Sequence, residues 1–249
     1  MSPQMNPRIN PRMNQLLAIE TSSEACSVAL RVDGQLYEAH ELAPLRHAEV
    51  LLPAVERLLA EAGVELSALD AVAFGRGPGS FTSLRIGIGV VQGLTWAAGL
   101  PVVPISSLAA LAQDAAEQVA DGVVVGDAPA PRERICVAVD ARMQEVFTAE
   151  FERGPGGLLR PVGEERVCPP SAVAAEPAPM VAVGNGFERF AELQPLCRAA
   201  RVCLPELWPR AAMVLRLAET WLQTHDPLPA ALAQPVYLRN NVAEKPVLR

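Results

Sequence analysis

Lysine is almost absent from this sequence. Of its 21 basic residues 20 are arginines, and the single lysine, Lys245, lies among the last five residues. A phosphate-loop lysine, a Schiff-base lysine and a lysine general base are therefore excluded from any interior site. The formal net charge of −7 also disfavours a chain that holds nucleic acid by itself, because such binding depends on neutralising phosphate groups.

Histidine is scarce as well, with only His40, His47 and His225 in the chain. The segment His47-Ala48-Glu49 imitates the start of the zinc-protease pattern H-E-x-x-H, but it is out of register and the second histidine is missing. No serine lies in the G-x-S-x-G pattern that is typical of hydrolase nucleophiles. The sequence therefore predicts neither a metal site nor a hydrolase nucleophile.

Paired cysteines and long apolar runs are missing too. The five cysteines form no C-x-x-C motif and their number is odd, so we expect free, mostly buried thiols in a reducing cytoplasm. Cys197 and Cys203 are expected to be packing residues. There is no apolar segment ahead of a small-residue cleavage site and no uninterrupted run of 18 or more apolar residues, which predicts no membrane association.

What is present is enough for a large core, because half of the 249 residues are hydrophobic. Residues 1–15 have few core-forming side chains and are predicted to be a disordered extension. Residues 16–126 form an N-terminal lobe, residues 127–235 form a smaller, proline-rich second lobe, and 236–249 are an extended, polar tail. The last helix of the second lobe, 209–223, either stays with that lobe or packs back on the first.

Hydrophobic periodicity predicts the elements of the first lobe. A strand over 16–22 precedes a hairpin over 25–42 around Asp33-Gly34, a strong turn signal. The remaining elements are a helix at 45–63, a strand at 71–75, a helix at 80–99, a strand at 102–105 and a helix at 107–119. Pro53 lies inside the first helix and predicts a kink or a late start.

The second lobe is predicted to contain a hairpin over 135–151, strands at 166–168 and 180–186, and helices at 187–199 and 209–223.

The order in the first lobe indicates a mixed sheet with helical crossovers. This layout resembles the ribonuclease-H-like fold of the actin-like ATPase superfamily. We therefore predict an α/β protein whose first lobe is such a mixed sheet flanked by helices and whose second lobe is smaller and richer in loops.

Two turns at strand ends are candidates for facing a phosphate group. Gly77, Gly79 and Ser80 belong to a glycine-rich turn between a strand and a helix, where backbone amides can hold an anion. Pro78 removes one donor, and a tight strand-to-helix turn explains the glycines equally well. The second candidate is Glu20-Thr21-Ser22 after the first strand, where superfamily ATPases place a phosphate-facing turn. A strand-end cap is the alternative.

The helix at 80–99 is apolar on two opposite faces, so both faces must be covered. Gly87, Gly89 and Gly93 each cost about 1 kcal/mol relative to alanine in a helix, which favours close approach of another backbone. A partner protein and internal burial by the helix at 45–62 and the second lobe both remain open. The residues predicted to contact a partner are apolar or small side chains of these two helices, namely Leu51, Val55, Leu58, Leu84, Gly87, Ile88, Val91 and Thr95.

Four segments of the chain resemble the TsaB (YeaZ) family: residues 16–30, 47–63, 72–94 and the tail 236–245. The most specific is the string G-P-G-S-F-T-x-L-R-I-G from Gly77 to Gly87. Ser83 departs from it, since glycine is expected at that position. The resemblance covers nearly the whole chain from residue 16, although 127–235 matches mainly by position.

The resemblance implies an α/β fold of two ribonuclease-H-like (actin-like ATPase superfamily) lobes, each a mixed sheet flanked by helices. It also implies a non-catalytic subunit that binds and organises the catalytic subunit TsaD through the helices at 45–62 and 80–98. TsaD transfers threonylcarbamoyl to the adenosine 3′ of the anticodon in tRNAs that read codons starting with A. In TsaD a metal-binding H-x-x-x-H follows the third crossover strand, and the matching positions here are Ser107 and Leu111, neither of which can ligate iron or zinc.

The resemblance further implies the ATPase TsaE as a second partner, a homodimer when the chain is alone, no direct tRNA contact and no required cofactor. The alternative interpretation is a small ATP-binding enzyme of the actin-like superfamily that uses Glu20 and the glycine-rich turn, with weak ATP binding.

Overall fold

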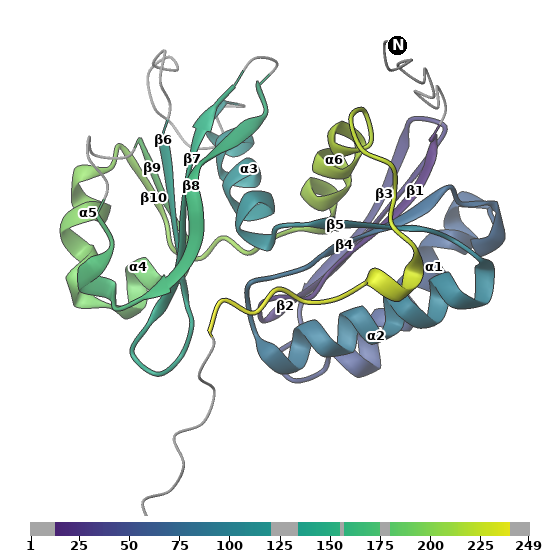
Figure 1. The fold of residues 1–249 in the computed structure, drawn as a ribbon, viewed down its shortest axis with the longest axis horizontal. Coiled ribbons are helices and arrows are strands. Elements are labelled where there is room, and N and C mark those ends of the chain that lie inside the picture. Colours follow the sequence, from purple (N-terminus) through teal and green to yellow (C-terminus); the bar gives the residue numbers. More distant parts are fainter. Residues whose placement is uncertain (1–12, 121–133, 155–156, 175–179, 240–249) are drawn as a thin grey trace, which may run out of the picture.

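The computed structural model describes residues 13–120, 134–154, 157–174 and 180–239, which fold into two lobes side by side (Figure 1). The residues outside these ranges include 1–12 of the predicted extension, 121–133 at the predicted boundary between the lobes, and 240–249 of the tail. Residues 13–15 do not belong to an extension, because Gln15 begins the first strand and Met13 packs against a buried cluster.

The first sheet has the strand order β3-β2-β1-β4-β5. Its strands are β1 (Gln15–Glu20), β2 (Ala25–Val32), β3 (Gln35–Leu42), β4 (Ala71–Gly75) and β5 (Val102–Ile105). β1, β2 and β3 form an antiparallel meander, whereas β4 and β5 run parallel to β1. Asp33 and Gly34 form the predicted hairpin turn with φ angles of 49° and 87°.

The second sheet repeats this arrangement with the order β10-β9-β6-β7-β8. Its strands are β6 (Arg134–Asp140), β7 (Val146–Arg153), β8 (Leu159–Cys168), β9 (Val181–Val183) and β10 (Val202–Leu204). Again an antiparallel meander of three strands is extended by two parallel strands next to its first strand. Both lobes therefore have the predicted ribonuclease-H-like order.

Helices cover both faces of both sheets (Figure 1). The α-helices are α1 (His47–Ala62), α2 (Phe81–Ala98), α3 (Ser107–Ala120), α4 (Gly186–Arg189), α5 (Gln194–Ala199) and α6 (Ala211–Trp221). The short 3-10 helices are η1 (Leu66–Ala68), η3 (Pro170–Ala172), η4 (Ala191–Leu193) and η5 (Ala230–Leu232). Pro53 lies in the interior of α1, so the predicted late start at this proline is wrong.

The helices α3 and α6 are exchanged between the lobes. α6 comes after the second sheet in the chain, yet its Ala211 and Leu215 pack on Leu16 and Ala18 of the first sheet. α3 comes after the first sheet, but its Leu108 and Leu111 belong to the core of the second. The boundary expected near residue 126 therefore differs from the packing, in which α3 and α6 lie between the two sheets.

The second lobe departs from the sequence-based prediction in several elements. The helix expected at 187–199 is divided at Phe190, whose backbone is extended. Pro195 lies in the first turn of α5, where its missing N–H costs no helical hydrogen bond. β8 runs from Leu159 to Cys168 instead of over three residues, and β10 was not predicted. Short strands and an exposed edge strand with polar residues carry little periodicity.

Cys197 and Cys203 form a disulfide that joins α5 to β10, so the expectation of free thiols is wrong for this pair. Their Cα atoms are 5.5 Å apart because the chain turns back between the helix and the strand. Cys26 and Cys136 are free and buried, and Cys168 is free and half-buried. Within the described part of the chain, no helix combines the length and the apolarity that crossing a bilayer requires.

Candidate functional site

Glu20 lies at the centre of the contact between the two predicted phosphate-facing turns. The Ser22 backbone N–H donates to its Oε1 at 2.5 Å, and the Ser107 hydroxyl donates to its Oε2 at 2.7 Å. The carboxyl group has no solvent exposure, and burial raises its pKa above the ordinary value. Glu20 therefore joins the end of β1 to the start of α3.

The glycine-rich turn packs directly on the turn after β1. The Ser80 N–H donates to the Ser22 carbonyl at 2.7 Å, and the Gly77 N–H donates to the Ser107 hydroxyl at 3.2 Å. A methyl group at Gly79 would overlap the Ser22 carbonyl, so only glycine fits there. The structure thus brings together all six predicted turn residues, of which Thr21 also contacts α2 by donating from its hydroxyl to the Ser83 carbonyl at 3.0 Å.

This arrangement does not fit a nucleotide phosphate. The backbone donors of Ser22, Gly77 and Ser80 already have acceptors within the chain, and Pro78 has no N–H. In addition, a phosphate here would lie close to the buried Glu20 carboxyl, which is a like charge whenever the group is ionised. The two turns serve each other as caps.

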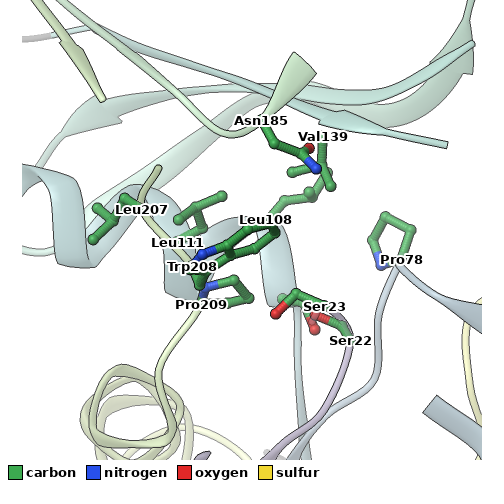
Figure 2. A pocket seen from close by; sticks show the side chains of 11 residues that line it. Ser22, Ser23, Pro78, Leu108, Leu111, Val139, Asn185, Leu207, Trp208 and Pro209 are labelled. Atoms are coloured by element: carbon green, nitrogen blue, oxygen red, sulfur yellow. The ribbon is translucent and has the colours of Figure 1, made fainter. Parts of the chain in front are cut away.

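The cleft between the lobes is nearly filled by side chains. Its cavity is about 10 Å³, room for about one water molecule. Figure 2 shows Ser22, Ser23 and Pro78 on one side and Val139 and Asn185 on the other.

Ser107 and Leu111, the positions that the resemblance predicts to match the TsaD histidines, lie one turn apart on α3 and both line this cavity. The Ser107 hydroxyl donates its hydrogen bond to Glu20, and Leu111 has an aliphatic side chain, so these two residues cannot ligate a metal ion as a pair of histidines does. Among the residues that the structure describes, no group of three or more His, Cys, Asp or Glu side chains is arranged to hold a metal ion.

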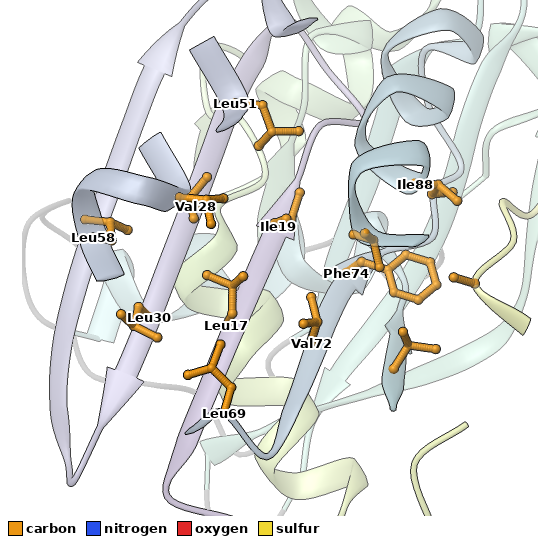
Figure 3. Close-up of a cluster of buried hydrophobic side chains, with 14 of the residues drawn as sticks. Leu17, Ile19, Val28, Leu30, Leu51, Leu58, Leu69, Val72, Phe74 and Ile88 are labelled. Carbon is orange, nitrogen blue, oxygen red and sulfur yellow. The ribbon is translucent and has the colours of Figure 1, made fainter. Parts of the chain in front are cut away.

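The eight residues predicted to contact a partner are all buried within the first lobe. Leu51, Leu58 and Ile88 belong to the core cluster that covers the first sheet (Figure 3). The apolar face that the sequence indicated on α2 exists, but it covers the lobe's own sheet. The other five residues, Val55, Leu84, Gly87, Val91 and Thr95, are buried as well, so none of the eight is accessible to a partner.

The opposite face of α2 is open. Trp96 is 82% exposed, and no atom lies within 4 Å of a Cβ placed at Gly89 or Gly93. Gly87 differs, because a Cβ there would overlap the Thr21 side chain. Leu52 on α1 is exposed as well, and Val90 and Leu94 of α2 are only partly buried against the core of the first lobe.

Sequence reasoning missed Trp96 and Arg239. Trp96 was overlooked because it is an isolated aromatic residue on a helix without a clear polar face. Arg239, in the tail segment 236–245, contacts the second lobe through Glu145. The family string in the tail was the available signal, but a string alone does not say what an arginine contacts.

Comparisons with known proteins agree with this architecture. The profile of the family described as "TsaD: tRNA N6-adenosine threonylcarbamoyltransferase" matches residues 40–247. The Escherichia coli "tRNA threonylcarbamoyladenosine biosynthesis protein TsaB" is 37% identical over 242 residues, which are 93% of this chain and 97% of that protein.

Two solved structures from Pseudomonas aeruginosa are similar over 91% of this chain and 100% of theirs. One, described as "an uncharacterized protein with similarity to peptidase YEAZ", has 41% identity and a TM-score of 0.81. The other, "YeaZ", has 40% identity and a TM-score of 0.78. The chain therefore belongs to the TsaB (YeaZ) family, within the wider group that the TsaD profile describes.

Proposed function

We propose that this chain is a non-catalytic subunit in tRNA threonylcarbamoyladenosine biosynthesis and that it binds a TsaD-type catalytic subunit through the exposed face of α2 and the neighbouring side of α1. In this role it supports transfer of threonylcarbamoyl to the adenosine 3′ of the anticodon in tRNAs that read codons starting with A. Membership of the TsaB family supports the pathway, and the exposed glycines of α2 support the surface.

The observation that carries the proposed surface is that Gly89 and Gly93 have open space where a side chain would go. Each glycine destabilises the helix by about 1 kcal/mol relative to alanine, and nothing within the described chain requires either one. A helix of another protein could approach α2 closely only at such positions. Trp96, one turn beyond Gly93, supplies the large exposed aromatic group that is common at the centre of interfaces.

The residues at the cleft support a non-catalytic role. Ser107 and Leu111 stand where the catalytic paralogue has its two metal-binding histidines, and Glu20 already accepts two hydrogen bonds from its own chain. Neither feature leaves a side chain free to activate a substrate. We propose that the chain acts in the cytoplasm, that it has no resident cofactor, and that it does not itself hold tRNA, in keeping with its net charge of −7.

The partners that follow are a TsaD-type transferase, an ATPase of the TsaE type and, when the chain is alone, a second copy of itself. An apolar helix face left open is expected to drive self-association. Light scattering after gel filtration is expected to give a dimer at high concentration, and a partner that uses the same face would convert it to a heterodimer.

The test of the surface uses Gly93→Leu and Trp96→Glu, with Ala199→Leu on the exposed side of α5 as the matched control. Both test variants change only exposed positions, so each is expected to fold with a melting temperature close to that of the parent. Titration calorimetry with a TsaD-type transferase is expected to give at least about tenfold weaker binding for both, and unchanged binding for the control. Parent-like affinity of both variants would refute this surface.

The alternative, an ATP-binding enzyme, is tested separately. Calorimetry with ATP and magnesium is expected to give no binding in the micromolar range, because the turn amides are already paired. Micromolar binding would favour the enzyme.

A further inference from the structure

The C-terminal segment runs across the molecule from the first lobe to the second. Leu228 pairs with Val102 on the edge of the first sheet through two hydrogen bonds of 2.8 Å. From there the chain passes over α2 and continues toward β7 and β8, as the yellow segment of Figure 1 shows. We call residues 233–239, the part beyond η5, the strap.

The strap is attached to the first lobe at three points. The Gln92 side-chain amide donates to the Ala233 carbonyl at 2.8 Å, and the Val236 N–H donates to the Arg76 carbonyl at 2.8 Å. Tyr237 accepts a hydrogen bond from Arg85 Nε at 3.0 Å and stands 5.6 Å from the Phe81 ring, between ring centroids. This end is therefore held by backbone, amide and aromatic contacts together.

At its other end the strap reaches the second lobe through Arg239. This guanidinium group forms an ion pair with Glu145, with Nε 3.1 Å from Oε2. It also donates to the Ala141 carbonyl at 3.3 Å and contacts the Met143 sulfur at 3.4 Å. All three acceptors belong to the turn between β6 and β7, so one side chain holds the whole turn.

This turn has an unusual backbone. Arg142, Met143 and Gln144 have φ angles of 62°, 53° and 60°, and none of them is glycine. The left-handed region is unfavourable for residues that carry a Cβ atom, and such conformations persist only where surrounding contacts overdetermine them. The contacts here include the Asp140 carboxylate, which accepts from the Arg142 N–H at 2.9 Å, a backbone hydrogen bond of 2.9 Å from the Ala141 N–H to the Glu145 carbonyl, and Arg239.

The strap is not alone in connecting the lobes across a cleft with room for about one water molecule, because α3 and α6 also contact each other through Arg216 and Glu117. Glu165 of β8 accepts a hydrogen bond from Ser106 and lies 3.8 Å from Arg76 of the first lobe. Two-lobed proteins commonly close around a ligand that supplies the contacts between lobes. In this chain its own residues supply them.

We propose that residues 233–239 are a strap that fixes the two lobes in one arrangement, with Arg239 as the latch that closes on the strained turn 141–145. The chain then keeps a single interlobe geometry without a ligand in the cleft. This inference concerns the fold alone and does not depend on the proposed function.

Hydrogen–deuterium exchange on the full chain tests the latch. In Arg239→Ala, amides of both the turn 141–146 and the strap are expected to exchange at least about tenfold faster, because each loses the contact that holds the other. Peptides from β1 and β4 are expected to be unchanged. The matched control is Arg57→Ala, which removes an exposed arginine of α1 with a 3.7 Å ion pair to Glu61. Faster exchange confined to the strap would overturn the proposal.

Two further measurements separate a latch from simple local packing. Small-angle scattering of Arg239→Ala is expected to give a larger radius of gyration than the parent, and an unchanged profile would overturn the interlobe role. In a double-mutant cycle with Glu145→Ala, the losses of turn protection are expected to be strongly non-additive. Additive losses would contradict pairing of these two residues. Should Arg239→Ala fail to fold, Arg239→Lys retains the charge pair and is expected to deprotect the turn partially.

Discussion

At the scale of single residues, Glu20 is a carboxyl group enclosed by its own chain. Burial raises its pKa above the ordinary value of 4.5, while the hydrogen bonds from Ser107 and Ser22 act in the opposite direction and are the weaker influence. The folded chain therefore binds this proton more tightly than the unfolded chain. The stability that the group contributes is complete below pH 4.5 and is lost as the pH rises through the folded-state pKa.

The first prediction concerns Glu20→Gln, which preserves the shape of the side chain but cannot ionise. Its unfolding free energy, relative to the parent, is expected to increase as the pH rises from 4 to 7. Denaturant titrations at several pH values measure this difference, and other carboxyl groups cancel in it. A difference that does not vary with pH would contradict the assignment. Glu20→Ala is the contrasting variant, expected to lose about 2 kcal/mol because the buried Ser22 N–H then has no acceptor.

At the scale of elements, α2 has two apolar faces with different roles. Ile88 and Val91 are at most 5% exposed and belong to the core above the first sheet. Gly89 and Gly93 lie on the other side, in open space. Periodicity finds both faces, but it does not say which one the rest of the chain covers, because that depends on where the sheet lies.

The second prediction contrasts these two faces. Ile88→Glu and Val91→Glu are expected to unfold the first lobe or destabilise it by more than about 3 kcal/mol, since each buries an unpaired carboxylate. Gly93→Ala is expected to stabilise the isolated chain by about 1 kcal/mol. Guanidinium denaturation measures all three. Native-like stability of Val91→Glu, or a loss of stability in Gly93→Ala, would show that the faces are assigned the wrong way round.

At the scale of the whole molecule, the exchange of α3 and α6 joins the lobes through a charged contact. Arg210 forms an ion pair with Glu38 of β3, with 2.8 Å between Nη2 and Oε2, and its Nε lies 3.9 Å from Asp114 of α3. Asp114 is only 2% exposed, and burial raises its pKa despite the attraction of Arg210. The guanidinium group thus compensates two acidic groups from different elements.

The third prediction is that Arg210→Ala lowers the unfolding free energy by on the order of 2 kcal/mol at pH 7, because two carboxylates lose their partner. The loss is expected to be smaller at pH 5 than at pH 7, because a raised pKa makes Asp114 take up its proton at a higher pH than an ordinary aspartate does. Thermal unfolding at the two pH values is the measurement. A loss equal at both would mean that Asp114 is not the group left uncompensated.

Much of the first lobe could be predicted because its signals are local. The strand at 71–75 and the strand at 102–105 were predicted with the bounds that the structure has, and the Asp33-Gly34 turn lies where its residues require. The second lobe was harder, since β9 and β10 have three residues each and show no periodicity. For the candidate site, the sequence indicated each of the two turns. It could not predict that they pack on each other, because this contact joins Glu20 to Ser107 and Ser22 to Ser80, which are far apart in the chain.

The sequence by itself determined the α/β class, the family membership that later comparisons bore out, and the lack of histidine and lysine chemistry, because these depend on composition, spacing and short strings. Only the tertiary structure decided that the predicted partner residues are core, that α3 and α6 are exchanged between lobes, and that Arg239 reaches across the cleft. The physical reason is that burial and long-range pairing depend on which surfaces the folded chain brings together, and local periodicity carries no information about that.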